Sequence, residues 1–186
     1  ENCSVSGSVS GTVYVGGVVG AQWNGSTTGC SSSATVKGTV YVGGVVGQTN
    51  GGATLTACYA TGNVIIEIDP VTNISGGGLV GLNGGNGVCA CYATGNVTST
   101  GSSTGYVHIG GFFGDNYTSV TACYWKNNHE QGIGYNKEGI APEVTKVDGT
   151  GVTWQKAVDA MNTALQNAGS KWRYELNGAL PTLRKQ

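Results

Sequence analysis

The chain has 186 residues, of which 34 are glycine, and 9 basic and 10 acidic side chains give it a formal net charge of −1. So weak a charge provides no surface for nucleic acid or an anionic membrane. No run of about 18 or more apolar residues occurs, so we expect no membrane insertion of this chain. A hydrophobic content of 39% favours an ordered β protein over a disordered one.

Two patterns recur along residues 1–125 and divide them into units. One begins with a cysteine and occurs at Cys3, Cys30, Cys58, Cys91 and Cys123. The other is a double glycine, two apolar residues and a further glycine, and it occurs at 16–20, 43–47, 77–81 and 110–114. The step from cysteine to double glycine is 13 residues in the first two units and 19 in the next two. This difference indicates a loop insertion within a fixed framework of four full units and the start of a fifth.

Each unit is predicted to form two short strands. The heptapeptide CYATGNV occurs at 58–64 and again at 91–97. Its alternation places Cys, Ala, Gly and Val on one face and Tyr, Thr and Asn on the other. We expect the small and apolar face to point inward, where neighbouring strands approach closely.

A single unit cannot bury its own apolar face, whereas stacked units can. We therefore predict an all-β fold, a β-helix-like solenoid of four to five coils. A β-sandwich or β-roll built from the same strands is the alternative.

The composition changes after Trp125, and most of the charge lies beyond it. We predict a solenoid domain over residues 1–125 and a small α+β capping region over 126–186. An open solenoid end needs such a cover against edge-to-edge association.

One helix is predicted at about 153–168, packed on the last coil. Thr153 is a candidate N-cap, and Gly169 is a candidate C-terminal glycine. Its apolar residues recur at helical spacing and form one stripe: Trp154, Val158, Met161, Leu165 and Ala168. The tail from residue 171 is predicted to form a strand, a turn and a short strand, with Trp172 and Tyr174 in the core of the cap.

The cysteines are predicted to be buried free thiols. Those that begin the units share one position, so neighbouring coils would stack them about 4.8 Å apart, whereas bridged Cβ atoms lie nearer 3.8 Å apart. Cys89 has no equivalent in the other units and is the one to suspect of a bridge. Neither Cys89 with Cys91 nor His108 or His129 has the spacing of a zinc site.

The residues 77–97, GGLVGLNGGNGVCACYATGNV, closely resemble the GLUG repeat, whose units pair a GGLVG core with a following CYATGNV. The resemblance covers about residues 1–125 and is best in the two middle units, because CSVSGSV and CSSSATV of the first two units lack the tyrosine. GLUG-type repeats occur in exported bacterial surface proteins, often adhesins or modules of secreted enzymes. The resemblance therefore implies a secreted or cell-surface, adhesin-like protein, and it brings no catalytic residues.

We expect no enzyme, catalytic residue, cofactor or metal. From residue 2 to residue 125 the only carboxylates are Glu67, Asp69 and Asp115. Polysaccharide hydrolases and lyases need clustered carboxylates or cations, and the two histidines are isolated from any nucleophile. The opening ENCSVSG has neither the basic nor the apolar region of an export signal, so we expect any such signal to have been removed.

The candidate binding residues are the outward ones of the heptapeptide: Tyr59, Tyr92, Tyr124, Asn63 and Asn96. Flat aromatic rings beside amide groups suit carbohydrate or a host or cell-surface protein. The alternative is that these tyrosines stabilise the sheet by stacking on each other. At the level of function, the alternative is a structural spacer or an accessory module of a secreted polysaccharide-degrading enzyme.

Other outward residues are weaker candidates. A second column is too mixed to predict a site: Tyr14, Tyr41, Ser75 and His108. Trp23 and Tyr117 are possible exposed anchors in turns. Four sequons are expected to mark surface positions: Asn24, Asn73, Asn96 and Asn116.

Overall fold

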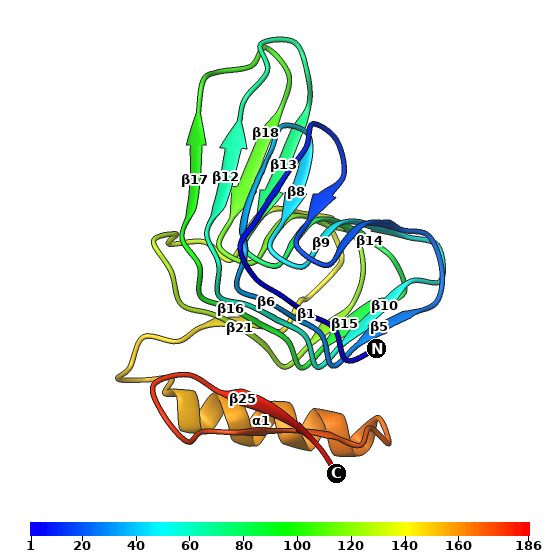
Figure 1. Ribbon diagram of the computed structural model, residues 1–186, viewed down its shortest axis with the longest axis vertical. Helices are drawn as coiled ribbons and strands as arrows, with labels where there is room; N and C mark the ends of the chain where they lie inside the picture. Colours follow the sequence, from blue (N-terminus) through cyan, green and yellow to red (C-terminus); the bar gives the residue numbers. More distant parts are fainter.

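The computed structural model describes residues 1–186 and is a β-solenoid with a helix and a hairpin along its side (Figure 1). This confirms the predicted all-β repeat fold. Each full coil, however, contains five short strands instead of two. Equivalent strands of successive coils pair in parallel and build five sheets, named A to E here in chain order.

Sheet A contains β1 (Ser4–Val5), β6 (Ser31–Ser32), β11 (Tyr59–Ala60), β16 (Tyr92–Ala93), β21 (Cys123–Trp125) and β23 (Val144–Lys146). Sheet B contains β2 (Ser8–Ser10), β7 (Thr35–Gly38), β12 (Val64–Glu67) and β17 (Val97–Thr100). Sheet C contains β3 (Val15–Gly16), β8 (Tyr41–Gly43), β13 (Ile74–Gly77) and β18 (Val107–Gly110). Sheet D contains β4 (Val19–Gln22), β9 (Val46–Asn50), β14 (Val80–Gly84), β19 (Phe113–Asn116) and β22 (Ile133–Asn136). Sheet E contains β5 (Ser26–Thr28), β10 (Thr54–Thr56), β15 (Gly87–Cys89) and β20 (Val120–Thr121).

Glycines divide the predicted strands into shorter ones by allowing sharp corners. The heptapeptide strand breaks at Gly62, between β11 and β12, where a Cβ atom would collide with the backbone of the coil before it. The double-glycine strand breaks between sheets C and D. There the second glycine of the pair, Gly78 in the third unit, would bring a Cβ atom into collision with Gly111 O of the next coil. The closing glycine, Gly81, lies within β14 against the backbone of Gly47 and also has no room for a side chain.

The coil cross-section has two arms that meet at an inner corner (Figure 1). Sheets B and C form one arm around a small core of Val15, Val36, Val42, Val64, Ile66, Ile74 and Val97. Sheets D, E and A enclose the larger core, which includes the paired apolar residues of every double-glycine segment. The outer face of sheet C meets sheet D at the inner corner, so a contact in that corner joins the two arms.

The predicted register of the heptapeptide is confirmed. Cys58, Ala60 and Val64 are fully buried, and Asn63 is exposed. All six cysteines are free thiols, as predicted, although Cys3 is exposed and Cys89 is half-buried. Within the stack each buried thiol donates to the carbonyl two residues before it, as Cys91 does to Cys89 O at 3.3 Å.

Stability is expected to fall steeply above about pH 9 because of these thiols. Burial raises the pKa of Cys58 and Cys91 above the ordinary 9.0, so both stay neutral in the folded state while the unfolded chain ionises. Each raised pKa therefore costs about 1.4 kcal/mol per pH unit above 9. The two together lower the free energy of unfolding by about 3 kcal/mol between pH 8 and pH 10.

Urea unfolding at pH 7 to 10, with reductant present, measures this dependence. The double variant Cys58→Ala with Cys91→Ala should show a shallower loss over the same interval. An unchanged slope in that variant would assign the alkaline loss to other groups.

A ladder of polar side chains runs through the buried part of sheet D. Thr49 Oγ1 donates to Asn83 Oδ1, Asn83 Nδ2 to Asn116 Oδ1, and Asn116 Nδ2 to Asn136 Oδ1, each at 2.8 Å. Asn136 then donates to Ile140 O at 2.8 Å. Buried polar groups are stable only when they are partnered, and this ladder provides one partner per coil.

The helix α1 (Trp154–Asn167) begins and ends as predicted. Thr153 caps it by accepting from Lys156 N, and Gly169 adopts a left-handed conformation at φ +65°. Of the predicted apolar stripe, all but Ala168 are buried. This 14-residue helix lacks the length and apolar character that a membrane crossing requires.

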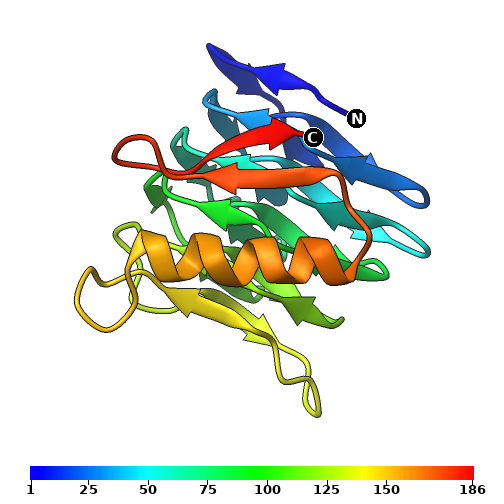
Figure 2. The same ribbon diagram turned by 90° about the horizontal axis from the view of Figure 1, so that it is seen from below.

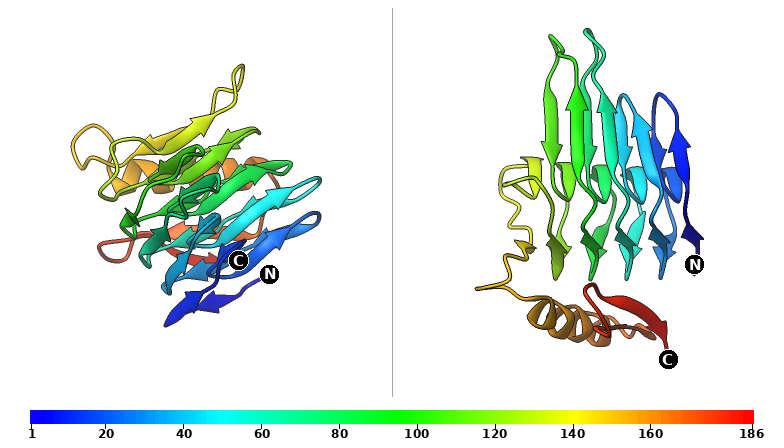
Figure 3. Two further views of the ribbon diagram at one scale, coloured as in Figure 1. Left: turned by 90° about the horizontal axis from the view of Figure 1, so that it is seen from above. Right: turned by 60° about the vertical axis from the view of Figure 1, so that its left-hand side comes forward.

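The helix packs on the last coil, as predicted, but on its side, and it does not cover the open end of the stack (Figures 2 and 3). It lies across the sides of the coils together with the antiparallel hairpin of β24 (Trp172–Glu175) and β25 (Thr182–Lys185) (Figures 2 and 3). The reason is that sheet A presents an apolar outer face, which the helix and hairpin bury. The last coil is extended instead by β22 and β23, beyond Trp125, which pair with β19 and β21.

Candidate functional site

The predicted column of Tyr59, Tyr92 and Tyr124 points away from the coil interior but is largely covered. The rings of Tyr59 and Tyr92 stack at 4.9 Å between centroids. Trp154 and Tyr174 pack on Tyr92 at 5.2 and 5.8 Å. Tyr92 is therefore 1% exposed, and Tyr59 and Tyr124 are half-buried. The expectation of an open ring at Tyr92 is wrong, because the C-terminal region occupies the space that a sugar would need.

Hydrogen bonds fix this covered face in place. The Tyr92 hydroxyl donates to Pro181 O at 2.5 Å, and the Tyr174 hydroxyl lies 3.0 Å from Ala90 O and 3.3 Å from Cys58 O. Burial raises the pKa of Tyr92 and of Tyr174. The contacts therefore favour the structural role for these tyrosines, namely anchoring the C-terminal region.

Asn63 and Asn96 are exposed, in the turns that connect sheets A and B of neighbouring coils. The side-chain oxygen of Asn63 accepts from Asn96 N at 3.0 Å. Neither residue contacts the tyrosine rings, so the structure does not assemble the five predicted residues into one surface. A binding role for the two asparagines stays a prediction.

Exposed aromatic rings gather instead at the inner corner. We call this set the aromatic strip: Tyr14, Tyr41, Tyr106, His108, Tyr117 and Tyr135. Four of its members are among the most exposed large side chains of the chain: Tyr14 at 41%, Tyr135 at 39%, Tyr106 at 38% and Tyr117 at 37%. The strip includes most of the second column, to which the sequence assigned no site.

The rings of the strip stack along the direction in which the coils are stacked. Tyr14 and Tyr41 lie 5.4 Å apart, and His108 lies between Tyr106 at 4.5 Å and Tyr135 at 5.1 Å, all within 15° of parallel. Tyr106 lies next to Tyr41 as well as to His108. Burial and then this neighbouring Tyr41 raise the pKa of Tyr106 to about 12. Stacked rings cover each other's faces, so the strip presents ring edges and hydroxyls along its length and a ring face at its ends.

A buried carboxylate orients the histidine of the strip. Asp115 is fully buried and accepts from Ser75 Oγ at 2.5 Å, and its second oxygen lies 2.6 Å from His108 Nδ1. A carboxylate partner places a proton on Nδ1 and turns Nε2 of His108 outward. Because Asp115 stands between the serine and the histidine, the two side chains make no hydrogen bond with each other, and the group positions the ring without the geometry of a Ser–His–Asp triad.

The sequence missed the strip because two of its members lie outside the repeat. Tyr106 belongs to the insertion of the fourth unit, and Tyr135 lies on β22, after the last recognisable unit. Ser75 occupies the register position between Tyr41 and His108, which made the column look interrupted. Tyr135 joins the strip because it pairs with Asp115 in sheet D, which faces the column on sheet C, and this pairing cannot be read from the repeat.

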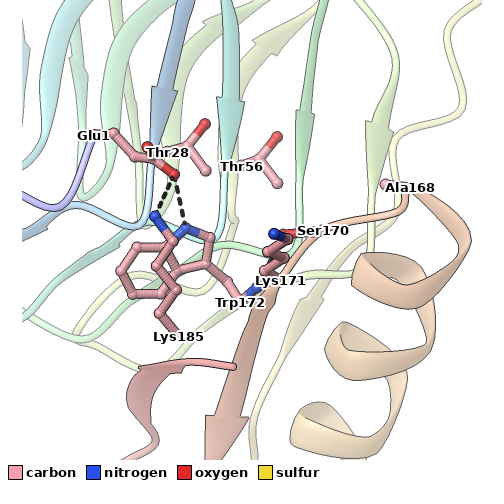
Figure 4. Close-up of a pocket in the computed structure, with 8 residues that line it drawn as sticks. All are labelled: Glu1, Thr28, Thr56, Ala168, Ser170, Lys171, Trp172 and Lys185. Atoms are coloured by element: carbon pink, nitrogen blue, oxygen red, sulfur yellow. Dashed lines mark hydrogen bonds and ion pairs between the residues drawn. The ribbon is translucent and has the colours of Figure 1, made fainter.

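A pocket of about 370 Å³ lies between the first coils and the hairpin (Figure 4). In it the Glu1 carboxylate accepts from Lys185 Nζ at 3.3 Å and from Trp172 Nε1 at 3.4 Å, which lowers the pKa of Glu1. Thr28 and Thr56 line the opposite wall from adjacent strands (Figure 4). Glu1 and Lys185 bind each other across it, so this pocket connects the first coil to the hairpin.

Two further surface expectations are resolved. Trp23 is 63% exposed in the turn after β4, as expected of a loop anchor. Asn116, expected at the surface as a sequon, is instead fully buried in the polar ladder of sheet D. No group of three or more His, Cys, Asp and Glu side chains is arranged to hold a metal ion.

Comparison with known proteins identifies one motif. The family model described as the GLUG motif matches residues 11–37, which include the double-glycine segment at 16–20 and the strand that follows Cys30. The matched part spans the end of the first unit and the start of the second, the two units that lack the tyrosine of CYATGNV. No curated protein and no solved structure matches the chain.

Proposed function

We propose that this GLUG-motif-containing chain is an extracellular, adhesin-like binding module that recognises neutral glycans through the aromatic strip. The GLUG motif occurs in extracellular repeat proteins, which supports the location. The single observation that carries the proposal is the exposed run of stacked aromatic rings at the inner corner, on a molecule whose other tyrosine column is covered.

The chemistry of the strip favours a hydroxyl-rich ligand. Tyrosines combine an apolar ring with a hydroxyl that can donate and accept, which matches the mixed surface of a sugar. The strip contains no lysine or arginine, and the Asp115 carboxylate is already engaged by Ser75 and His108. A neutral glycan is therefore favoured over a uronate or a sulfated chain.

The proposal is a non-catalytic one. The side chains of the strip hold no pair of free carboxylates at which acid–base cleavage of a glycosidic bond could occur. Glu67, one of the three carboxylates of the repeat region, forms an ion pair with Lys37 at 2.8 Å on the surface of sheet B.

A glycan array probed with the purified chain tests the proposal. Retention by neutral polysaccharides is expected, and each of Tyr14→Ala and Tyr135→Ala should weaken it about 3- to 10-fold, since one aromatic contact contributes about 0.5–1.5 kcal/mol. Trp23→Ala is the matched control, because it removes an exposed aromatic ring elsewhere and should leave binding unchanged.

Loss of binding in the Trp23 variant alone would move the site to that turn. An array without any neutral hit, from a chain whose unfolding curve is normal, would overturn the glycan proposal. Shortening of a polysaccharide by the wild-type chain would contradict the non-catalytic one.

A further inference from the structure

A second pocket, of about 450 Å³, lies between α1 and the last coil, on the opposite side of sheet A from the inner corner. Its volume is within the range of about 300–1,000 Å³ typical of small-molecule sites. The helix contributes one stripe of residues to it: Ala160, Thr163, Ala164 and Asn167. The coil contributes the other wall: Thr121, Ala122, Tyr124, Glu143 and Thr145. Figure 2 shows the helix passing along these last coils.

The pocket exists because the stack of coils ends here while the helix continues. Sheet E stops at β20, so no further strand fills the space beside Thr121. Larger side chains of the helix pack on Tyr92. Beside Tyr124 the helix has only the small Ala160 and Ala164, which leave the ring of Tyr124 half-exposed. Tyr124 is thus the one tyrosine of the predicted column that lines an open space.

Glu143 is held in place by a hydrogen bond in which its carboxylate takes the position of the carbonyl that a further coil would provide. In the inner coils the equivalent backbone N–H donates to the next coil, as Ala57 N does to Cys89 O at 3.1 Å and Ala90 N to Thr121 O at 2.9 Å. In the last coil Ala122 N donates to Glu143 Oε2 at 3.1 Å. One carboxylate oxygen is therefore fixed, and the group stays at the pocket wall.

The remaining polar side chains of the pocket keep hydrogen-bonding capacity for a ligand. Thr163 donates to Asp159 O at 2.9 Å and keeps its acceptor capacity. The side chains of Thr121, Tyr124, Thr145 and Asn167 make no hydrogen bond in the structure. This distinguishes the pocket from the one at Glu1, whose only carboxylate is already bound by Lys185 and Trp172.

We infer that this pocket binds a single neutral sugar residue, separately from the aromatic strip. One aromatic ring, one carboxylate, one amide and several hydroxyls around a floor of alanines provide the apolar patch and the convergent hydrogen bonds that a ring of hydroxyls needs. No lysine or arginine lines the pocket, and Glu143 would repel a uronate. The inference does not depend on the strip, which lies on another face.

Saturation-transfer NMR and titration with glucose, galactose, mannose and N-acetylglucosamine test it, with glucosamine and glucuronate as charged counterparts. We expect at least one neutral sugar to bind and glucuronate to fail. Glu143→Gln keeps an acceptor for Ala122 N but loses the charge, and it should weaken binding roughly tenfold. Tyr124→Phe removes only a hydroxyl and should weaken binding about 3- to 10-fold.

Ala160→Leu fills the pocket and should abolish binding, whereas Gln166→Leu adds the same side chain on an exposed part of the helix and should not. Trp23→Ala, outside both the pocket and the strip, should leave this binding unchanged. Retention of the chain by neutral polysaccharides should survive Ala160→Leu, which separates the two proposals. Absence of every neutral sugar signal would overturn the inference, as would binding that survives Ala160→Leu in a folded variant. Binding of glucosamine alone would replace the neutral sugar with an amine ligand.

Discussion

Asn83→Ala should lower the free energy of unfolding by about 3–5 kcal/mol. The substitution removes an acceptor from Thr49 and a donor from Asn116, and each buried group left without a partner costs about 1–3 kcal/mol. The lost hydrogen bond from Asn83 to Thr118 Oγ1, at 3.1 Å, adds to this. Urea denaturation followed by circular dichroism measures the shift of the midpoint.

Asn96→Ala is the matched control for this substitution. Asn96 is exposed, and its side chain makes no hydrogen bond, so the change should stay within about 0.5 kcal/mol of the wild type. Equal midpoints for the Asn83 and Asn96 variants would show that the polar ladder of sheet D does not stabilise the coils.

Gly81→Ala should destabilise the fold by at least about 3 kcal/mol or prevent folding. Its Cβ atom would lie 2.5 Å from Gly47 O, 2.6 Å from Val42 N and 2.9 Å from Tyr41 C. These are backbone atoms of the parallel ladders at the inner corner, so they cannot move without breaking hydrogen bonds between coils. Thermal unfolding and the yield of folded protein measure the effect.

Gly178→Ala provides the comparison, because no atom lies within 4 Å of the added methyl group and its φ is not positive. That variant should be unchanged or more stable by about 0.4–1 kcal/mol, through the lower entropy of its unfolded chain. A Gly81 variant as stable as the Gly178 variant would mean that the inner corner can open. Its aromatic strip would then lose its fixed geometry.

The register of the coils could be predicted from the sequence because every unit repeats the same landmark residues. Cysteines at one position and glycines at another define which residues stack, and the alternation of CYATGNV gives the inward and outward faces. The division into five strands did not follow, since a glycine inside a strand pattern is compatible with either a bulge or a corner. Only the close approach of Gly62 and Gly78 to neighbouring backbone decides between them.

The position of the C-terminal region could not be read from its own residues. An apolar stripe on 153–168 requires a buried partner, but periodicity does not identify that partner. The outward tyrosines also required a buried partner. The tyrosines and the C-terminal region meet through contacts between residues far apart in the sequence, such as Tyr92 and Pro181. The burial of Tyr92 was missed for the same reason, because alternation shows that a side chain points out of a coil but not that it reaches solvent.

The lateral position of the helix and hairpin has a consequence for biosynthesis. The coils up to Trp125 can form as they are made, since each pairs with the one before it, but Trp154, Trp172 and Tyr174 come later in the chain. The newly made coils therefore expose the outward tyrosines of sheet A until the end of translation. A chaperone that shields aromatic surface would act in that interval, and a chain interrupted after Lys146 would aggregate through the face that the complete protein conceals.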